Sequence, residues 1–336
     1  MNIGRRPLIA GGAALMATRL TPAQQPKKTR TLGLFGVGPR PTQKDIAESP
    51  TLARLRELGW TEGGNLIVER SFAEGKANRL RDLATELVAK LPDVIWTANP
   101  EAAIAAARAT RTIPIVFWSV PFPVEQGLID SFARPGRNVT GVAFFPGLDV
   151  SLKRLELLRN CAPTVKRVAW ISSWNLRETM SGGRVYGSTW GATITAALKL
   201  GFELQWHPID TRENFDIAFD SILNSQQQAL AVDYSELLLQ HRKLTVDFAM
   251  RHSLPNIYAS SQFVEAGGLA SYGPDPVAMA VYSMSYVDKI LRGAKPADLP
   301  VEIPSQYVLA VNLTTAKELG LTLPQSVLLR ADKVIQ

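Results

Sequence analysis

The chain has 336 residues, a length that favours two domains over one. Its composition is 46% hydrophobic and 20% charged, which excludes an intrinsically disordered chain and allows well-packed cores. The formal net charge is +7, but no run of Lys or Arg concentrates it, so nucleic-acid binding is disfavoured.

The first 23 residues have the layout of an export signal. Arg5 and Arg6 form a basic start, the apolar stretch 8–17 is too short to span a membrane, and Ala23 offers a cleavage site. The paired arginines favour the twin-arginine route. We therefore expect residues 1–23 to be a signal peptide and the mature protein to be periplasmic. A poorly ordered N-terminal helix is the alternative.

From residue 31 onward, strand and helix signals alternate. Short apolar runs rich in β-branched residues predict strands, and apolar residues at helical spacing predict helices. In this first part strands are expected at 31–37, 65–72, 93–97 and 113–118, and helices at 42–58, 78–90 and 100–109. This rhythm is typical of a parallel sheet with helices on both faces.

The stretch from 113 to 145 predicts the first crossing between two lobes. A proline-rich loop at 119–124 follows the strand, and a short helix is expected at 125–132. A cluster of helix breakers at 133–137 leads into another strand at 138–145. We expect a ligand cleft beside this crossing.

After the crossing the alternation restarts. Strands are expected at 165–172, 202–209, 229–233 and 256–259, and helices at 151–158, 186–200, 214–223 and 237–252. The remaining chain predicts a second crossing at 267–272, a returning helix at 276–291, a linker at 292–304, a strand at 307–312, and helix, turn and helix at 313–334.

The predicted fold class is α/β, with two lobes of similar size joined by three linking strands. Each lobe is expected to contain a parallel sheet with helices on both faces. Lobe 1 is expected to comprise 31–142 plus 273–303, and lobe 2 to comprise 143–270 plus 304–336. Because each lobe is discontinuous in sequence, a single cut of the chain is not expected to give two stable halves.

Four phrases of the sequence together resemble one family. They are RLELLRNCAP at 154–163, FVEAGGLASYG at 263–273, GAKPADLPVEIPSQYVLAVNLTTAKELGLTLP at 293–324, and IPIVF with RPGRNVTGV within 113–142. The resemblance is to the ABC-transporter substrate-binding proteins whose best-known relatives carry tryptophan or tyrosine, and it covers nearly the whole chain from Thr31.

This resemblance implies a type I periplasmic-binding-protein fold, with two Rossmann-like lobes and three hinge strands. It implies a monomer that captures a small molecule by closure of the lobes and delivers it to an ABC permease. It implies no cofactor and no chemistry on the ligand.

One segment departs from the family pattern, which has a Gly-Asp-Pro-Val phrase after the strand at 113–118. The matching phrase at 121–124 reads PFPV, so Phe122 stands where the family has an acid. Trp174 lies in a polar loop, where an exposed tryptophan needs a reason. Both residues favour an aromatic or otherwise apolar ligand.

Candidate ligand contacts follow from the topology. Ligands of open α/β sheets bind beyond the carboxyl ends of the strands, where helix N-termini present free amides that suit an anion. In lobe 1 this rule selects Gly36, Val37, Thr97, Ala98, Asn99, Ser119 and Phe122. In lobe 2 it selects Ser172, Ser173, Trp174, Asn175, Asp233, Tyr234, Ser260 and Glu265.

Several of these residues have a structural alternative. Thr97 and Asn99 would cap the helix that begins at Pro100, and a capping residue can also contact a ligand. Asp233 would either cap a helix or bind a ligand amine. Glu265 is expected to hold the hinge by hydrogen bonds rather than to contact the ligand.

Other distinctive residues are expected in the core. Trp96 and Trp118 lie within predicted strands, and Cys161 lies in a helical pattern. Cys161 is the only cysteine, which excludes an intrachain disulfide. The three histidines are far apart in sequence and lack metal-ligand spacing.

Three other functions share parts of the pattern. An α/β enzyme is disfavoured because no GxxxxGK, GxSxG or HExxH motif occurs, and the glycines of GLFGVGPRP are interrupted by prolines. A transcription regulator of the same fold would need a helix-turn-helix before the first strand. A periplasmic sensor partner stays open as an alternative, because it would use the same closed form as a transport protein.

Overall fold

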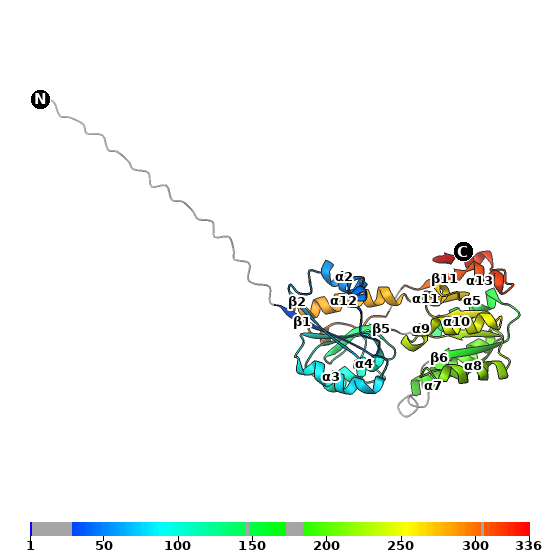
Figure 1. Ribbon diagram of the computed structural model, residues 1–336, viewed down its shortest axis with the longest axis horizontal. Coiled ribbons are helices and arrows are strands. Elements are labelled where there is room, and N and C mark those ends of the chain that lie inside the picture. Colours follow the sequence, from blue (N-terminus) through cyan, green and yellow to red (C-terminus); the bar gives the residue numbers. More distant parts are fainter. Residues whose placement is uncertain (2–28, 145–147, 173–183, 304–305) are drawn as a thin grey trace.

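The structure is a computed structural model that describes residues 1, 29–144, 148–172, 184–303 and 306–336. These residues form two lobes that lie side by side, each a sheet flanked by helices (Figure 1). We call the five-stranded sheet with its helices lobe 1 and the seven-stranded sheet with its helices lobe 2. The predicted two-lobe α/β fold is confirmed. The predicted signal peptide lies outside the described residues.

The sheet of lobe 1 has the strand order β2-β1-β3-β4-β5, and all neighbouring strands are parallel. The bounds are Arg30–Gly36 (β1), Leu66–Phe72 (β2), Val94–Thr97 (β3), Ile115–Val120 (β4) and Val139–Ala143 (β5). Strands β3 and β4 are buried along their whole length, as their continuous apolar runs predict. The carboxyl ends of these strands lie at one edge of the sheet.

Helices cover both faces of this sheet. Their bounds are Gln43–Ala47 (α1), Pro50–Glu57 (α2), Ala77–Arg79 (η1, a 3-10 turn), Leu80–Ala89 (α3), Pro100–Ala109 (α4), Pro276–Leu291 (α12) and Pro296–Asp298 (η2, a 3-10 turn). On one face α3 and α4 pack against Phe35 and Phe117, and the buried alanines of α4 allow a close approach. On the other face α2 and α12 pack against Leu34 and Trp96. Helix α12 follows lobe 2 in the chain and returns to lobe 1, as predicted.

The sheet of lobe 2 has the strand order β12-β11-β10-β9-β8-β6-β7. The bounds are Arg167–Ser172 (β6), Glu203–Pro208 (β7), Ala229–Val232 (β8), Asn256–Tyr258 (β9), Ala270–Gly273 (β10), Val308–Asn312 (β11) and Lys333–Ile335 (β12). The prediction of a wholly parallel sheet is wrong here, because β10 and β11 are antiparallel. Strand β10 runs toward lobe 1, whereas β11 arrives from lobe 1 after the third crossing and therefore runs in the opposite direction.

Helices also cover both faces of the second sheet. Their bounds are Leu148–Cys161 (α5), Arg184–Lys199 (α7), Asn214–Asn224 (α8), Glu236–Gln240 (α9), Arg242–Arg251 (α10), Ser261–Glu265 (α11), Leu313–Glu318 (α13) and Gln325–Leu328 (α14). Helices α5, α7, α13 and α14 pack on the face that carries Trp170 and Ile257. Helices α8, α10 and α11 pack on the face that carries Ile171 and Tyr258.

Two predicted helices are each divided in the structure. The expected helix at 42–58 is split into α1 and α2, because Ser49 caps α2 and Pro50 occupies its first position. Proline disfavours the helical conformation of the residue before it, so α1 cannot continue into α2. The expected helix at 237–252 is split at His241 into α9 and α10.

One further helix prediction is wrong, and another is confirmed except for its last residues. Residues 125–132 form turns, and Gly127 within them has φ of +67°, a left-handed conformation that ends a helix. The C-terminal helix, turn and helix expected at 313–334 are α13 and the short α14 followed by β12. Strand β12 forms because 333–335 pair in parallel with β11, a contact that local sequence cannot signal.

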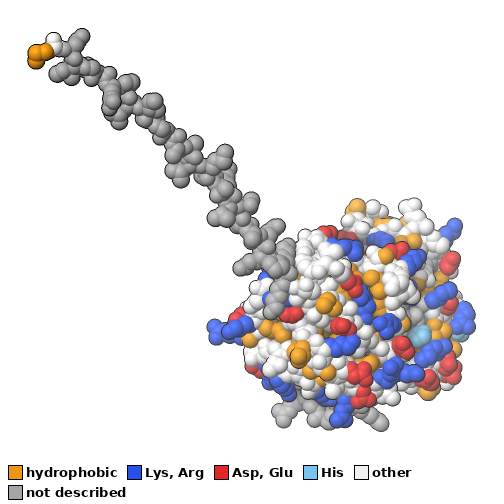
Figure 2. Space-filling view, turned by 60° about the vertical axis from the view of Figure 1, so that its left-hand side comes forward, with side chains coloured by type: hydrophobic (Ala, Val, Ile, Leu, Met, Phe, Trp, Pro, Cys, Tyr) orange, Lys and Arg blue, Asp and Glu red, His pale blue; other side chains and the backbone are white. Residues whose placement is uncertain are grey.

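The residues expected in the core are buried. Trp96 and Trp118 stack with ring centroids 6.4 Å apart, and Trp96 Nε1 donates to Ser283 Oγ of α12 at 2.8 Å. Cys161 is buried as predicted, and burial raises the pKa of its thiol to about 11. On the face in Figure 2, Lys and Arg side chains are interspersed with Asp and Glu. No helix among the described residues is long and apolar enough to cross a bilayer.

Candidate functional site

A cleft of about 200 Å³ lies between the two lobes. Segments that follow β1, β2, β3 and β5 line it from lobe 1, together with the end of β4, and segments that follow β7 and β8 line it from lobe 2. The carboxyl ends of both sheets therefore converge on a shared space, as the topology rule for open α/β sheets predicts. Among the described residues, no group of three or more His, Cys, Asp or Glu could hold a metal ion.

The lobe 1 wall contains four of the predicted residues. Val37 follows β1, Ala98 and Asn99 follow β3, and Ser119 lies in β4. Asn99 also caps α4, because its Oδ1 accepts a hydrogen bond from the backbone N–H of Ala102 at 3.0 Å. Asn99 is thus both a cap and a lining residue, the combination left open from sequence.

Ser119 has an unusual backbone conformation at the end of β4. Its φ is +68°, a left-handed value that is uncommon for residues other than glycine. The register between β4 and β5 shifts at this point, between Trp118 and Val120. Such locally strained positions are concentrated at ligand-binding sites, because the surrounding structure must over-determine them. Here the surrounding structure holds Ser119 on the wall of the cleft.

The lobe 2 wall is built around Tyr234, another predicted residue, which follows β8. Its ring packs against Phe144 of lobe 1, with ring centroids 4.9 Å apart. Ser235 then caps α9 by accepting from the backbone N–H of Leu238 at 3.1 Å. Burial, and secondarily the charge of Glu236, raise the pKa of the Tyr234 phenol, so the ring stays neutral in the cleft.

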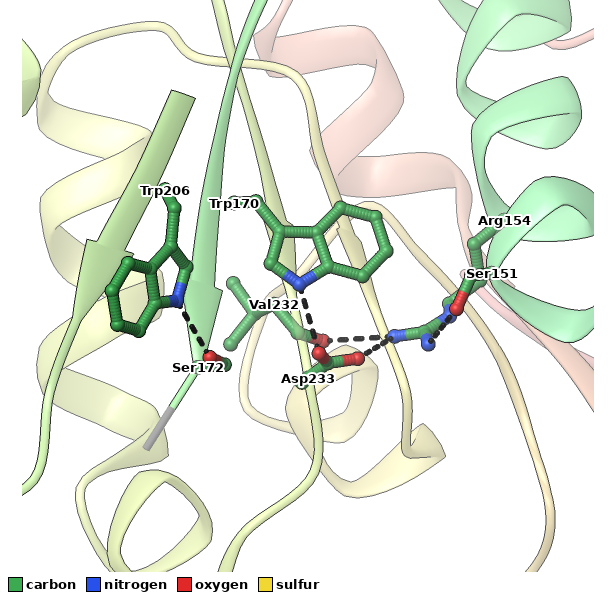
Figure 3. Close-up of polar contacts among 7 residues, drawn as sticks. All are labelled: Ser151, Arg154, Trp170, Ser172, Trp206, Val232 and Asp233. Carbon is green, nitrogen blue, oxygen red and sulfur yellow. Dashed lines mark hydrogen bonds and ion pairs between the residues drawn. The ribbon is translucent and has the colours of Figure 1, made fainter. Parts of the chain in front are cut away.

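Asp233 directly precedes Tyr234 and is not among the residues that line the cleft; Figure 3 shows its polar partners. Its Oδ2 accepts from Trp170 Nε1 at 2.8 Å, and its Oδ1 forms an ion pair with Arg154 Nη1 at 2.8 Å. Arg154, on α5, is completely buried and also donates to Ser151 Oγ and to the carbonyl of Val232. The carboxylate therefore does not cap α9, which Ser235 does, and both of its oxygens already have partners within the protein.

Other predicted residues also lie away from the cleft lining. Ser172 accepts from Trp206 Nε1 at 2.9 Å (Figure 3), and Ser260 caps α11. Glu265 pairs with Lys333 at 2.8 Å and so joins α11 to β12, whereas it was expected to hold the hinge. The predicted residues that do not line the cleft are Gly36, Thr97, Phe122, Ser172, Asp233, Ser260 and Glu265. Ser173, Trp174 and Asn175 lie outside the described residues.

Gly36, Thr97 and Phe122 have packing roles next to the lobe 1 wall. A Cβ at Gly36 would come within 3.3 Å of Ala98, so glycine allows the segments after β1 and β3 to approach. Thr97 is completely buried in β3, and Phe122 is buried in the proline-rich loop with φ of +47°. The aromatic surface of the cleft is therefore supplied by Phe144 and Tyr234 instead of Phe122.

Sequence reasoning missed several lining residues. Phe144 follows β5, Asp210 follows β7, and Glu101 and Glu236 lie in the first turns of α4 and α9. Acids in a first helical turn are ordinarily explained by the helix dipole, so the sequence offers no separate reason to predict the two glutamates as ligand contacts. The two glutamates share one sequence signal. Each lies one or two residues after a helix cap, Asn99 or Ser235, and that cap comes soon after the end of a strand.

The two glutamates interact electrostatically across the cleft. The surrounding protein atoms, and to a lesser degree the negative charge of Glu236, raise the pKa of Glu101. Solvent reaches the Glu101 side chain, because it lies in an open cleft and not in the core. Gln240 Nε2 donates to Glu236 Oε1 at 3.1 Å, which orients that carboxylate without neutralising it.

Comparisons with known proteins agree with this architecture. Residues 46–335 match the family described as ABC transporter substrate binding protein. A tyrosine-binding protein of Clostridioides difficile is 25% identical over 295 residues, which cover 88% of this chain and 82% of that protein.

Two solved structures share the fold. A conserved domain protein from Vibrio cholerae is 27% identical, with a TM-score of 0.79 over 91% of this chain and 100% of the other. An ABC domain from Streptococcus pneumoniae in complex with L-Trp is 24% identical, also with a TM-score of 0.79, over 92% of this chain and 100% of the other. The fold is therefore that of type I periplasmic binding proteins, with one antiparallel strand pair in lobe 2. The chain belongs to the ABC transporter substrate-binding protein family.

Proposed function

We propose that this protein captures an aromatic or otherwise apolar amino acid-like molecule between its lobes and delivers it to an ABC permease. The observation that carries the proposal is the cleft itself, which both lobes line with aromatic rings and with polar groups near strand ends. Phe144 and Tyr234 provide an apolar surface, and Asn99 and Ser119 provide hydrogen-bonding groups beside the N-terminus of α4. The relatives named for tyrosine and found with L-Trp support this ligand class.

The mechanism that we attach to this proposal is closure about the crossings between the lobes. Ligand first binds one wall, and the second wall then covers it. The closed form docks on the permease as a monomer, without a cofactor. In this scheme residues 1–23 direct export to the periplasm, and the lobes are divided close to the expected boundaries at 142, 273 and 303, with β5 in lobe 1 and β10 in lobe 2. A periplasmic sensor partner would use the same closed form.

A thermal-shift screen of the purified mature chain tests the ligand class. L-tryptophan, L-tyrosine and L-phenylalanine are the probes, with ribose and glycerol as polar controls. A ligand at 100 times its Kd adds about 2.7 kcal/mol to the free energy of unfolding, which raises Tm. If only the polar controls raise Tm, the proposed ligand class is wrong.

Two further measurements separate the proposed role from its alternatives. Mass spectrometry of the ligand recovered after incubation should show it unchanged, and a converted product would indicate an enzyme. Uptake of the bound amino acid should fall in a strain that lacks this protein. Normal uptake together with a lost transcriptional response would favour the sensor partner.

A further inference from the structure

The cleft is lined by acids and not by bases. Glu101 from lobe 1 and Asp210 and Glu236 from lobe 2 line it, and no Lys or Arg is among its described lining residues. Neither glutamate forms an ion pair with a described residue. Arg81 and Arg108 share a neighbouring groove between α3 and α4 with Glu101, but neither arginine lines the cleft. The carboxylates of Glu101 and Glu236 therefore have no cationic side chain beside them on the described lining of the cleft.

A second feature independently marks the cleft as a binding site. Ser119 is only 6% exposed and lines the cleft, yet its hydroxyl forms no hydrogen bond with any described residue. Asn99 is 4% exposed and uses its Oδ1 to cap α4, so its amide nitrogen is left for another partner. Both groups face the cleft, where a ligand group can replace water as their hydrogen-bond partner. A ligand acceptor group beside Asn99 and Ser119 would pair both.

These two features give the cleft two kinds of polar group. Asn99 and Ser119, close to the N-terminus of the ten-residue helix α4, offer donors to an electron-rich group. Glu101 and Glu236 come from opposite lobes and share one sign of charge. Like charges that approach as the lobes close repel one another, and the low-dielectric walls strengthen that repulsion.

We infer that Glu101 and Glu236 together receive one cationic nitrogen of the ligand, and that this cation is required for the lobes to close. Without it, the repulsion between the carboxylates of opposite walls favours the open form. With a protonated amine between them, each carboxylate gains an ion pair, and closure becomes favourable. This inference rests on the proposed function, because it uses the same cleft, and it specifies a ligand class: amines that are protonated at neutral pH.

The first experiment compares three probes that share an indole ring. They are L-tryptophan, tryptamine, which lacks the carboxylate, and indole-3-propionate, which lacks the amine. By calorimetry at pH 7.5 we expect tryptamine to bind and indole-3-propionate to bind at least 100-fold more weakly. Glu101→Gln and Glu236→Gln should each weaken tryptamine binding at least tenfold, whereas Glu203→Gln, on the exposed edge strand β7, should not change it. Equal affinity of the wild type for tryptamine and indole-3-propionate would overturn the inference.

The second experiment needs no ligand and so separates this inference from the proposed function. Small-angle scattering at low ionic strength should show a smaller radius of gyration for the double variant Glu101→Gln/Glu236→Gln than for the wild type. Added salt should shrink the wild type toward the variant, because salt screens the repulsion. An identical radius for both proteins at every salt concentration would contradict the repulsion. If no indole probe binds the wild type, the proposed ligand class is wrong. The scattering result then tests by itself whether repulsion between Glu101 and Glu236 favours the open form.

Discussion

In lobe 1 the wall of the cleft is positioned by backbone features: the cap at Asn99, the left-handed turn at Ser119 and the close approach at Gly36. In lobe 2 the corresponding wall is positioned by a buried ion pair. The buried Arg154 pairs with Asp233, the residue immediately before Tyr234, and Trp170 donates to the same carboxylate. A wall held by backbone geometry tolerates most side-chain changes outside its special positions. A wall held by a buried ion pair fails when either partner is lost.

The largest expected effect is on the ion pair behind the lobe 2 wall. Arg154→Met should lower the free energy of unfolding by about 4 kcal/mol, because it leaves the Asp233 carboxylate largely buried without its cation. Urea denaturation measures the change. The matched lobe 1 pair is Arg30 with Asp93, which are 2.7 Å apart, against 2.8 Å for Arg154 and Asp233, but whose side chains are 28% and 29% exposed. Arg30→Met should therefore cost less, at about 1 kcal/mol or below.

A double variant isolates the cause of that loss. Arg154→Met/Asp233→Leu removes both charges and should recover at least half of the stability lost in the single variant. A double variant as unstable as Arg154→Met would show that packing around Trp170, and not charge, supports the wall. Ligand affinity of the double variant then reports how well Tyr234 is still positioned.

The next largest expected effect is the loss of stability when a glycine is replaced in a strand that leaves each lobe. A Cβ at Gly141 of β5 would lie 1.9 Å from the carbonyl oxygen of Phe117, and one at Gly273 of β10 would lie 1.9 Å from that of Ala259. Gly141 also has φ of +146°. We expect Gly141→Ala to cost about 3 kcal/mol and Gly273→Ala about 2 kcal/mol, because only the first adds backbone strain to the clash. Thermal unfolding measures both.

Gly191 of α7 provides the control for these glycine variants. A Cβ there meets no other atom within 4 Å, and Gly191 lies in a helix. Gly191→Ala should leave stability unchanged or raise it by up to about 1 kcal/mol. Equal stability of all three alanine variants would mean that the strands leaving the lobes can separate from their neighbours without cost.

A third comparison concerns acid. All three histidines belong to lobe 2, and burial lowers the pKa of His207 in β7 from 6.5 to about 4. Because the folded-state pKa lies below the unfolded-state pKa, the unfolded chain binds more protons between pH 6.5 and 4. Stability therefore falls as the pH falls through this range, by up to about 3 kcal/mol. Unfolding measured from pH 7 to pH 4 should show this loss in the wild type.

Replacement of His207 tests the source of that loss. His207→Gln does not titrate, so its unfolding free energy should depend less steeply on pH between 6.5 and 4 than that of the wild type. His252→Gln, at an exposed position at the end of α10, is the control and should follow the wild type. Parallel pH profiles for the wild type and His207→Gln would assign the acid sensitivity to other groups.

The smallest expected effects on stability come from replacing the two helix caps that line the cleft. Asn99→Ala and Ser235→Ala should each cost about 1 kcal/mol, the usual value of a cap. Asn99→Asp keeps the capping oxygen and removes the amide donors. It should retain stability but lose affinity for L-tryptophan, as measured by calorimetry. Unchanged affinity would limit Asn99 to its capping role.

The sequence was most informative where local signals decide the structure. Asn99 followed by Pro100 predicted the start of α4, and Asp275 with Pro276 marks the start of α12 in the same way. The strand ends then predicted Val37, Ala98, Asn99, Ser119 and Tyr234, all of which line the cleft. The sequence could locate these residues because caps, prolines and apolar runs act on residues close to them in the chain; their contact with a ligand stays a prediction.

The sequence could not show contacts between distant segments. Asp233 looked available to a ligand because nothing nearby in sequence pairs with it. Its partner Arg154 lies on α5 and reaches it only after β6 and β8 have paired. Glu265 in the same way meets Lys333 of β12. Glu101 and Glu236 gain significance only because folding places them on opposite walls of one cleft.

The sequence by itself determined the alternation of strands and helices, the two lobes and the edge of each sheet that faces the cleft, because these follow from short-range periodicity and chain direction. Only the tertiary structure decided which polar side chains are already paired and which still face the cleft. Pairing depends on distance in space between residues far apart in the chain, and local sequence carries no information about that distance.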